Sequence, residues 1–146
     1  MTDPLHQDAA DLAEDAKRLL LELDRDVPGA TNVTAECRPP LDVLETASTV
    51  EVVVDIPGVP IHALRVVVRR QTVLVVGVKL STPSEPTTRF HVAERGYGRF
   101  ARAVRLHGAF DATRAHAVTS GGQLRVVLPR VEDRRGLLIS VPIEHV

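Results

Sequence analysis

The feature that most constrains the fold is a change in the spacing of apolar residues at Pro40. Before it, from about Asp8 to Asp26, apolar residues recur every three or four positions, the period of an amphipathic helix. After it they recur at every second position, and residues 50, 52, 54 and 56 of Thr49–Ile56 are all Val or Ile. Period-2 alternation is typical of strands with one buried face. The chain therefore combines an N-terminal helix with a β-rich domain.

The alternating segments are short and no helical segment separates them. The predicted strands are Thr49–Ile56, Leu64–Arg70, Thr72–Val78, Phe100–Leu106, Thr113–Thr119 and Gln123–Leu128, with Phe90–Glu94 as a possible short strand. Pro57-Gly58 and Ser120-Gly121-Gly122 supply turns. Short strands at this spacing predict an all-β antiparallel sandwich or barrel. The 23 valines and 3% aromatic residues fit a core of branched aliphatic side chains.

The predicted N-terminal helix carries one apolar stripe, made of Leu12, Ala16, Leu19, Leu20 and Leu23. Asp8, Asp11 and Glu14 near its start favour the positive end of the helix dipole, and Pro28-Gly29 ends it. A helix of this length is marginal in isolation. We therefore expect its stripe to pack against a partner, and we assign Leu12, Leu19, Leu20 and Leu23 to an arm for client binding or assembly.

Several classes of function are disfavoured by what the sequence lacks. It has one cysteine, Cys37, and its six histidines show no metal-ligand spacing. It shows no nucleophile elbow, phosphate-binding loop or paired catalytic carboxylates. We predict that the protein is not an enzyme and uses no cofactor or metal. The acidic start resembles no secretory signal, and no apolar run approaches the roughly 20 residues of a membrane span, so we expect a cytoplasmic protein without a membrane partner.

Charge is distributed unevenly along the chain. Residues 1–36 hold nine acidic and three basic residues, a net charge of −6, whereas the remainder carries +5. A basic segment of this kind could bind nucleic acid. The bases are nevertheless scattered singly among acidic residues, which favours a solvated, salt-bridged surface. We predict no nucleic-acid partner.

Four motifs, in order along the chain, resemble those of small heat-shock proteins of the bacterial and plant type, which contain an α-crystallin domain. They are Asp55-Ile56-Pro57-Gly58-Val59, Leu74-Val75-Val76-Gly77, the segment from Glu94 to Arg102 that matches Glu-Arg-x-Tyr-Gly-x-Phe-x-Arg, and Ala117 with Gly122, Leu124 and Leu128-Pro129-Arg130. Each motif is weak alone, but their joint order and spacing are specific. The resemblance covers roughly residues 38–143.

This resemblance implies an immunoglobulin-like sandwich of seven to eight strands in two sheets. It divides the chain into an arm and linker (residues 1–37), the sandwich (38–130) and a C-terminal extension (131–146). It implies an ATP-independent chaperone, or holdase, that binds unfolded or partly unfolded client proteins and assembles from dimers into larger homo-oligomers. The alternative is an interaction module of the CS-domain type, a related sandwich that docks on a larger chaperone but would not need an apolar tail.

The resemblance also assigns binding residues. In the extension, Ile139, Val141 and Ile143 share one face when extended, and they resemble the family's tail anchor. The implied receiving groove lies between two predicted strands and contains Leu64, Val66, Val68, Ala115 and Ala117. The implied dimer loop, which crosses to a partner subunit, contains Phe90, His91, Val92, Glu94 and Arg95.

Arg102 has the same strand parity as Phe100 and Val104, so alternation turns it toward the apolar face. In one interpretation its guanidinium reaches water at a sheet edge. In the other it is partly buried and held by a carboxylate or by backbone carbonyls. The signature arginine of the family falls at this position, which favours a structural arginine.

Overall fold

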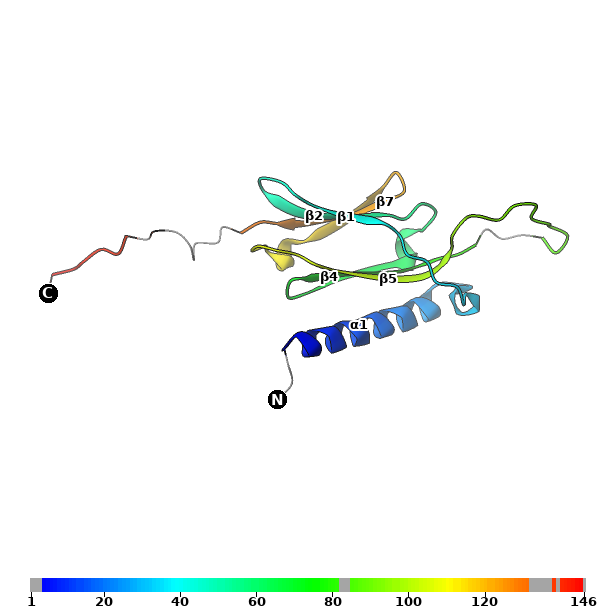
Figure 1. Ribbon diagram of the computed structural model, residues 1–146, viewed down its shortest axis with the longest axis horizontal. Helices are drawn as coiled ribbons and strands as arrows, with labels where there is room; N and C mark the ends of the chain where they lie inside the picture. Colours follow the sequence, from blue (N-terminus) through cyan, green and yellow to red (C-terminus); the bar gives the residue numbers. More distant parts are fainter. Residues whose placement is uncertain (1–3, 82–84, 132–137, 139, 146) are drawn as a thin grey trace.

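The computed structural model describes residues 4–81, 85–131, 138 and 140–145. Within them, seven strands form two antiparallel sheets packed face to face, with one helix outside the second sheet (Figure 1). The first sheet has the order β1 (Leu41–Glu45), β2 (Thr49–Asp55), β7 (Gln123–Pro129), β6 (His116–Ser120), and the second β3 (Leu64–Arg69), β4 (Thr72–Lys79), β5 (Gly98–Arg105). The predicted all-β sandwich is confirmed.

The core lies between the two sheets and follows the predicted alternation. Val50, Val52 and Val54 of β2 are at most 5% exposed, and three residues of β7 join them from the neighbouring strand: Leu124, Val126 and Leu128. From the second sheet, Val73 and Val75 face them. Phe100 lies across Gly77 of the adjacent strand, where any Cβ would collide with its ring.

One predicted strand boundary was wrong, and one strand was not predicted, each for a local reason. The strand expected over Thr113–Thr119 begins at His116, because a 3-10 turn (Ala112–Arg114) precedes it. The Asp111 carboxylate stabilises this turn by accepting hydrogen bonds from the Thr113 amide at 3.0 Å and its hydroxyl at 2.6 Å. Strand β1 was not predicted, since it is an edge strand whose side chains are mostly exposed and show little apolar alternation.

The segment between β4 and β5 projects from one end of the sandwich (Figure 1). Its residues Phe90–Glu94 were a possible short strand, but they form no strand in the single chain that the structure describes. The reason is that a strand needs a neighbouring backbone to satisfy its N–H and C=O groups, and within one chain these residues have no such neighbour in the described sheets.

Helix α1 (Pro4–Asp26) lies along the outer face of the β3–β4–β5 sheet (Figure 1). It begins at Pro4 rather than Asp8, in keeping with the preference for proline in the first helical turn. The amphipathic helix predicted from the leucine stripe is confirmed. Its partner is the sandwich of its own chain.

The segment expected to be a linker, Thr31–Pro40, is tied to β5. A 3-10 turn (Ala30–Asn32) follows α1, and the chain then runs parallel to the start of β5. The Cys37 amide donates to the Arg99 carbonyl, and the Arg99 amide to the Ala35 carbonyl, both at 2.9 Å. The C-terminal end of α1 is therefore anchored to the sandwich.

A third short turn, Ile61–Ala63, precedes β3.

Candidate functional site

The interface between α1 and the sheet has an apolar floor. The register of β3 with β4 places Val67, Leu74 and Val76 on the outer face of the sheet. Leu74 and Val76 are 2% and 0% exposed although they lie on an outer face, so α1 covers them. On the helix, Leu19 and Leu23 are 4% and 0% exposed, and Leu12 and Leu20 are partly buried.

A row of arginines on β3 borders this floor and pairs with acidic residues of α1. Arg69 binds Asp15 through two hydrogen bonds, Nε to Oδ2 at 2.6 Å and Nη2 to Oδ1 at 2.9 Å. Its other terminal nitrogen lies 3.9 Å from Asp11. Next to it, Arg70 forms an ion pair with Asp8 near the start of the helix. The hydrogen bond from Arg69 holds the pKa of Asp15 below its ordinary value of 3.8.

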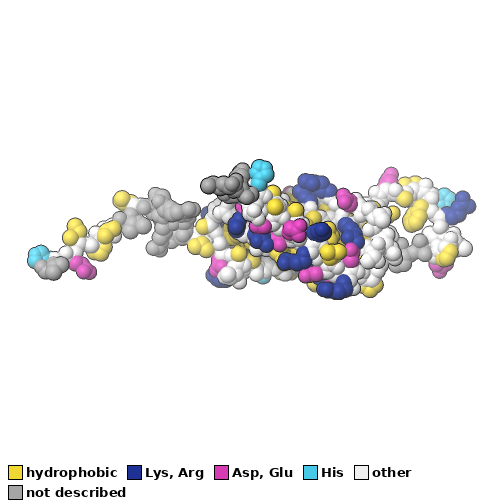
Figure 2. Space-filling view, turned by 90° about the horizontal axis from the view of Figure 1, so that it is seen from below, with side chains coloured by type: hydrophobic (Ala, Val, Ile, Leu, Met, Phe, Trp, Pro, Cys, Tyr) yellow, Lys and Arg dark blue, Asp and Glu magenta, His cyan; other side chains and the backbone are white. Residues whose placement is uncertain are grey.

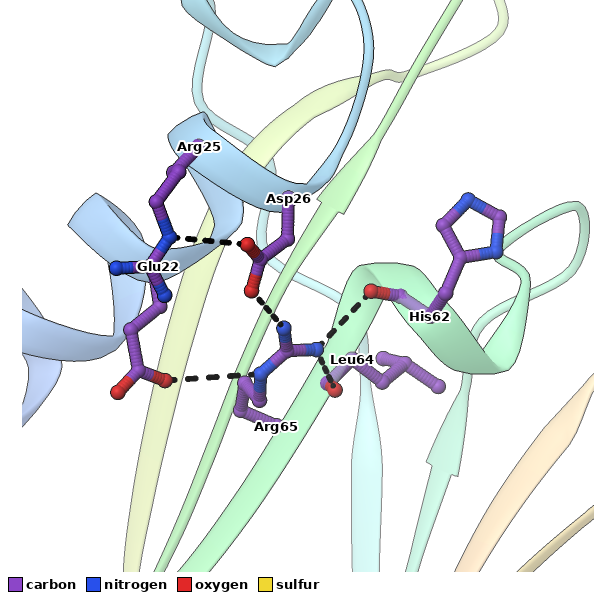
Figure 3. A network of polar contacts seen from close by, with 6 residues as sticks. All are labelled: Glu22, Arg25, Asp26, His62, Leu64 and Arg65. Atoms are coloured by element: carbon purple, nitrogen blue, oxygen red, sulfur yellow. Dashed lines mark hydrogen bonds and ion pairs between the residues drawn. The ribbon is translucent and has the colours of Figure 1, made fainter.

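At the other end of β3, Arg65 joins the end of α1 (Figure 3). Its guanidinium lies 3.0 Å from Asp26 and 3.7 Å from Glu22. The same group donates to the carbonyls of His62 at 3.0 Å and Leu64 at 2.9 Å, which fix its orientation (Figure 3). Hydrogen bonds from Arg25 and then Arg65 lower the pKa of Asp26.

The opposite flank of the helix is held by β5. Arg99 pairs with Asp24 and also donates to the carbonyls of Val33 and Ala30, each at 3.3 Å. Seen from the α1 side, basic and acidic side chains alternate across the middle of the molecule (Figure 2). The charge split in the sequence is therefore explained by an acidic helix that docks on a basic sheet face. The expected salt bridges are present, and several of them connect these two elements.

This interface was not predicted as a site. The leucine stripe identified α1, but the charge split was interpreted only as a solvated, salt-bridged surface, which included the receiving residues Arg65, Arg69, Arg70 and Arg99. Choosing among the bases requires knowledge of which of them share one sheet face with the apolar floor. That information comes from strand pairing.

The predicted groove residues meet at one hollow between the edge strands β3 and β6. Val66 and Val68 line it from one side, and Ala115 and Ala117 from the other, with Val126 also lining it. Both strands have one unpaired edge in the described sheets. Leu64, the fifth predicted groove residue, is instead 8% exposed within the core cluster, because the start of β3 is covered at that point.

The predicted dimer loop exposes large apolar side chains. Phe90, Val92 and Tyr97 are 69%, 72% and 47% exposed. Together with Glu94 and Arg95 they border a hollow next to the end of β4. His91 is exposed on the same segment. The predicted dimer loop therefore carries a cluster of exposed apolar side chains.

Val131, the first residue of the C-terminal extension, is tied to the sandwich, because its amide donates to the Ala109 carbonyl at 3.0 Å. Farther along, Val141 and Ile143 are 77% and 97% exposed, and this segment extends away from the domain (Figure 1). Ile139, the third predicted anchor residue, lies outside the described residues. The two described anchor residues are therefore not packed against their own sandwich.

Arg102 is partly buried, and its Nη1 donates to the Pro39 carbonyl at 2.6 Å. Of the two alternatives, the contact corresponds to a guanidinium held by a backbone carbonyl. Burial, and secondarily the nearby positive charge of Arg38, lower the pKa of Arg102. The contact joins β5 to the segment that leads into β1.

Among the described residues, no group of three or more His, Cys, Asp or Glu side chains could hold a metal ion. In the same part of the chain, no helix has the length and apolar character that crossing a membrane requires.

Comparison with known proteins agrees with this geometry. The family model described as "Hsp20/alpha crystallin family" matches residues 42–144, which is most of the chain. The match covers the sandwich and most of the extension. The chain belongs to the Hsp20/alpha crystallin family. Members of this family are chaperones, so the interpretation as a CS-type module is not favoured.

Individual relatives support the assignment. A rice (Oryza sativa subsp. japonica) 18.9 kDa heat shock protein is 33% identical over 72% of this chain and 60% of its own length. Heat shock protein 16 of Schizosaccharomyces pombe is 31% identical over 84% of this chain and 82% of its own. The solved structure of heat shock protein 16.0 from S. pombe superposes with a TM-score of 0.64, at 29% identity, over 75% of this chain and 100% of that one. The sandwich is thus that of a small heat-shock protein.

Proposed function

We propose that the protein is an ATP-independent holdase that binds unfolding proteins and keeps them from aggregating. The observation that carries this proposal is that the chain has both an open apolar groove at the β3–β6 edge and an exposed apolar tail. A holdase must offer apolar surface and also keep it covered reversibly, because large exposed apolar patches cause self-association.

The tail suits reversible covering of the groove in another subunit. Val141 lies eleven positions after Arg130, a span of up to about 36 Å when extended. Burial of two branched aliphatic side chains contributes roughly 3–6 kcal/mol before the cost of ordering the tail is subtracted. A single docked tail is therefore weak, whereas many tails in one oligomer act together through their high effective concentration.

The building block that we propose is a dimer formed through the projecting loop. Residues Phe90–Glu94 have exposed apolar side chains and no strand neighbour within the described sheets of the chain. If this segment pairs with an edge strand of a second copy, the unpaired backbone groups of both are satisfied. Dimers then associate through their tails into larger homo-oligomers. The predicted cytoplasmic location is part of this proposal.

The test is a light-scattering assay of a heat-sensitive client protein. We expect suppression of aggregation at near-stoichiometric ratio, equally with and without ATP. A strict requirement for ATP, or no suppression at any ratio, would contradict the proposal.

A further inference from the structure

We propose that the outer face of the β3–β4–β5 sheet is a docking surface for acidic amphipathic helices of other proteins, and that α1 is its resident occupant. The proposed use of this surface in holding clients rests on the holdase function proposed above. The preferred client segment is a helix with an apolar stripe and a row of carboxylates beside it.

The surface combines an apolar floor with a basic border. Val67, Leu74 and Val76 form the floor, and Arg65 and Arg69 project from the same face of β3. The floor continues onto β5, where Ala101 pairs with Val76 and Ala103 with Leu74 in the register. Ala101 and Ala103 are exposed, so α1 leaves part of the face uncovered. A second helix therefore has an apolar strip on which to begin contact.

The spacing of charges on α1 matches that of the sheet. Asp15 meets Arg69, and Asp26 meets Arg65. Eleven helical residues rise about 16 Å, and four strand residues rise about 13 Å, a difference that the long arginine side chains span. The helix therefore presents carboxylates at the intervals at which β3 presents guanidinium groups. Bidentate pairing, as in Asp15 with Arg69, makes the match specific for carboxylates.

The resident helix is fixed more firmly at one end than at the other. Its C-terminal part contains Leu23 and leads to Val27, and both side chains are at most 2% exposed. The segment that follows is hydrogen-bonded to β5. The N-terminal half has Leu12 only partly buried and is held by ion pairs of Asp8 and Asp15. The Asp8–Arg70 pair is exposed on both sides and is therefore weak, and Asp15, itself only 6% exposed, pairs with an Arg69 side chain that is 40% exposed. The helix can therefore separate from its N-terminal end and yield the face to a competitor.

The alternative occupant chemistries fit less well. A neutral helix would leave Arg69 without its bidentate partner, and a basic helix would place like charges beside Arg65 and Arg69. These observations favour an acidic occupant over a neutral or a basic one.

The probe is a fluorescent peptide with the sequence of residues 4–26, titrated into the full-length protein and followed by anisotropy. The matched control peptide carries Asn or Gln in place of each Asp or Glu. We expect the acidic peptide to bind at least about tenfold more tightly than the neutral one, and its affinity to fall as salt is added.

A full-length variant tests competition by the resident helix. Asp15→Asn weakens the hold on α1 but keeps every receiving arginine, so we expect acidic-peptide affinity to rise about fivefold. Glu51→Gln is the matched control, because Glu51 binds Arg125 at 2.7 Å on the other sheet. It should leave the affinity unchanged. Adding Arg69→Gln to Asp15→Asn should abolish the gain, and circular dichroism should verify that all three variants are folded.

Equal binding of the acidic and neutral peptides, absence of peptide binding, or an unchanged affinity in the Asp15→Asn/Arg69→Gln variant relative to Asp15→Asn would overturn the proposed surface. The aggregation assay separates this proposal from the holdase function. Suppression of aggregation without peptide binding would leave the holdase standing and refute the acidic-helix surface. Peptide binding without suppression would refute the holdase and leave the surface standing.

Discussion

At the scale of single residues, the arginines of this protein differ in what they contact. Arg65, Arg69 and Arg99 pair with carboxylates of α1, and each connects the helix to one strand of the sheet. Arg102 lies on the inner face of β5 and donates to a backbone carbonyl. The first three hold an arm onto the sandwich, whereas Arg102 holds the sandwich to the segment that leads into its first strand.

Replacing Arg102 with Ala should lower the free energy of unfolding by about 1–2 kcal/mol, because a charge-assisted hydrogen bond to the Pro39 carbonyl is lost. Arg105→Ala is the matched control, since Arg105 is an exposed arginine on the same strand, and it should cost less than about 0.5 kcal/mol. Urea denaturation measures both. Equal effects of the two substitutions would indicate that the Arg102 guanidinium is effectively solvated.

The stabilising effect of Asp15 should depend on pH. Its pKa is lowered below 3.8 in the folded protein, where Arg69, Arg18 and Asp11 are the nearby charges. Its contribution is therefore fully present above about pH 4 and is lost as the pH falls through the folded pKa. The difference in unfolding free energy between the native protein and Asp15→Asn should be constant from pH 7 to about 5 and should shrink toward pH 3. A difference that does not change with pH would argue against ionised pairing.

At the scale of elements, the sandwich leaves edges that are not paired within the described chain. Strands β1 and β6 end one sheet, and β3 and β5 end the other. The preceding linker partly covers the start of β5, and the hollow beside β3 and β6 stays open. Unpaired edges favour association with other chains. The projecting loop and the tail are the elements available to meet them.

Deletion of residues 81–92 should give a folded but monomeric sandwich. The physical reason is that the proposed dimer contact depends on this loop, while the core strands β2, β4 and β7 do not include it. Analytical ultracentrifugation gives the mass, and far-UV circular dichroism verifies the fold. A variant that is still dimeric would place the subunit interface elsewhere.

At the scale of the whole molecule, three parts have different degrees of attachment. The sandwich holds the core, α1 is docked on its outer face, and the described tail residues 140–145 lie away from it (Figure 1). Stability of the domain and assembly of the oligomer should therefore depend on different residues. The tail is the part in which this separation can be tested.

Replacing Val141 and Ile143 with Gly should reduce the protein to dimers or small species in size-exclusion chromatography. Both side chains are exposed, so their loss should move the unfolding midpoint of the dimer by less than about 2 °C. Leu138→Gly is the control, since Leu138 is also fully exposed but lies outside the predicted anchor. A full-size oligomer in the double variant would exclude this tail as the connector.

The sequence by itself determined the elements whose residues carry their own periodic signal. Alternating aliphatic residues in Thr49–Asp55 and Gln123–Pro129 specify strands with one buried face, and the leucines of α1 specify an amphipathic helix. The family motifs located the groove strands and the projecting loop. In each case the signal lies within a few residues of one segment.

The tertiary structure alone decided which surfaces these elements share. The pairing of β3 with β4 places Arg65 and Arg69 beside Leu74 and Val76. The sheet face that receives the acidic helix forms only through this pairing. Strand β1 and the tied linker at Cys37 likewise depend on neighbours distant in sequence. Local periodicity sets which face of a segment is apolar, but long-range pairing sets what that face meets. For this reason the charge split could be read from the sequence, whereas the ion pairs that explain it could not.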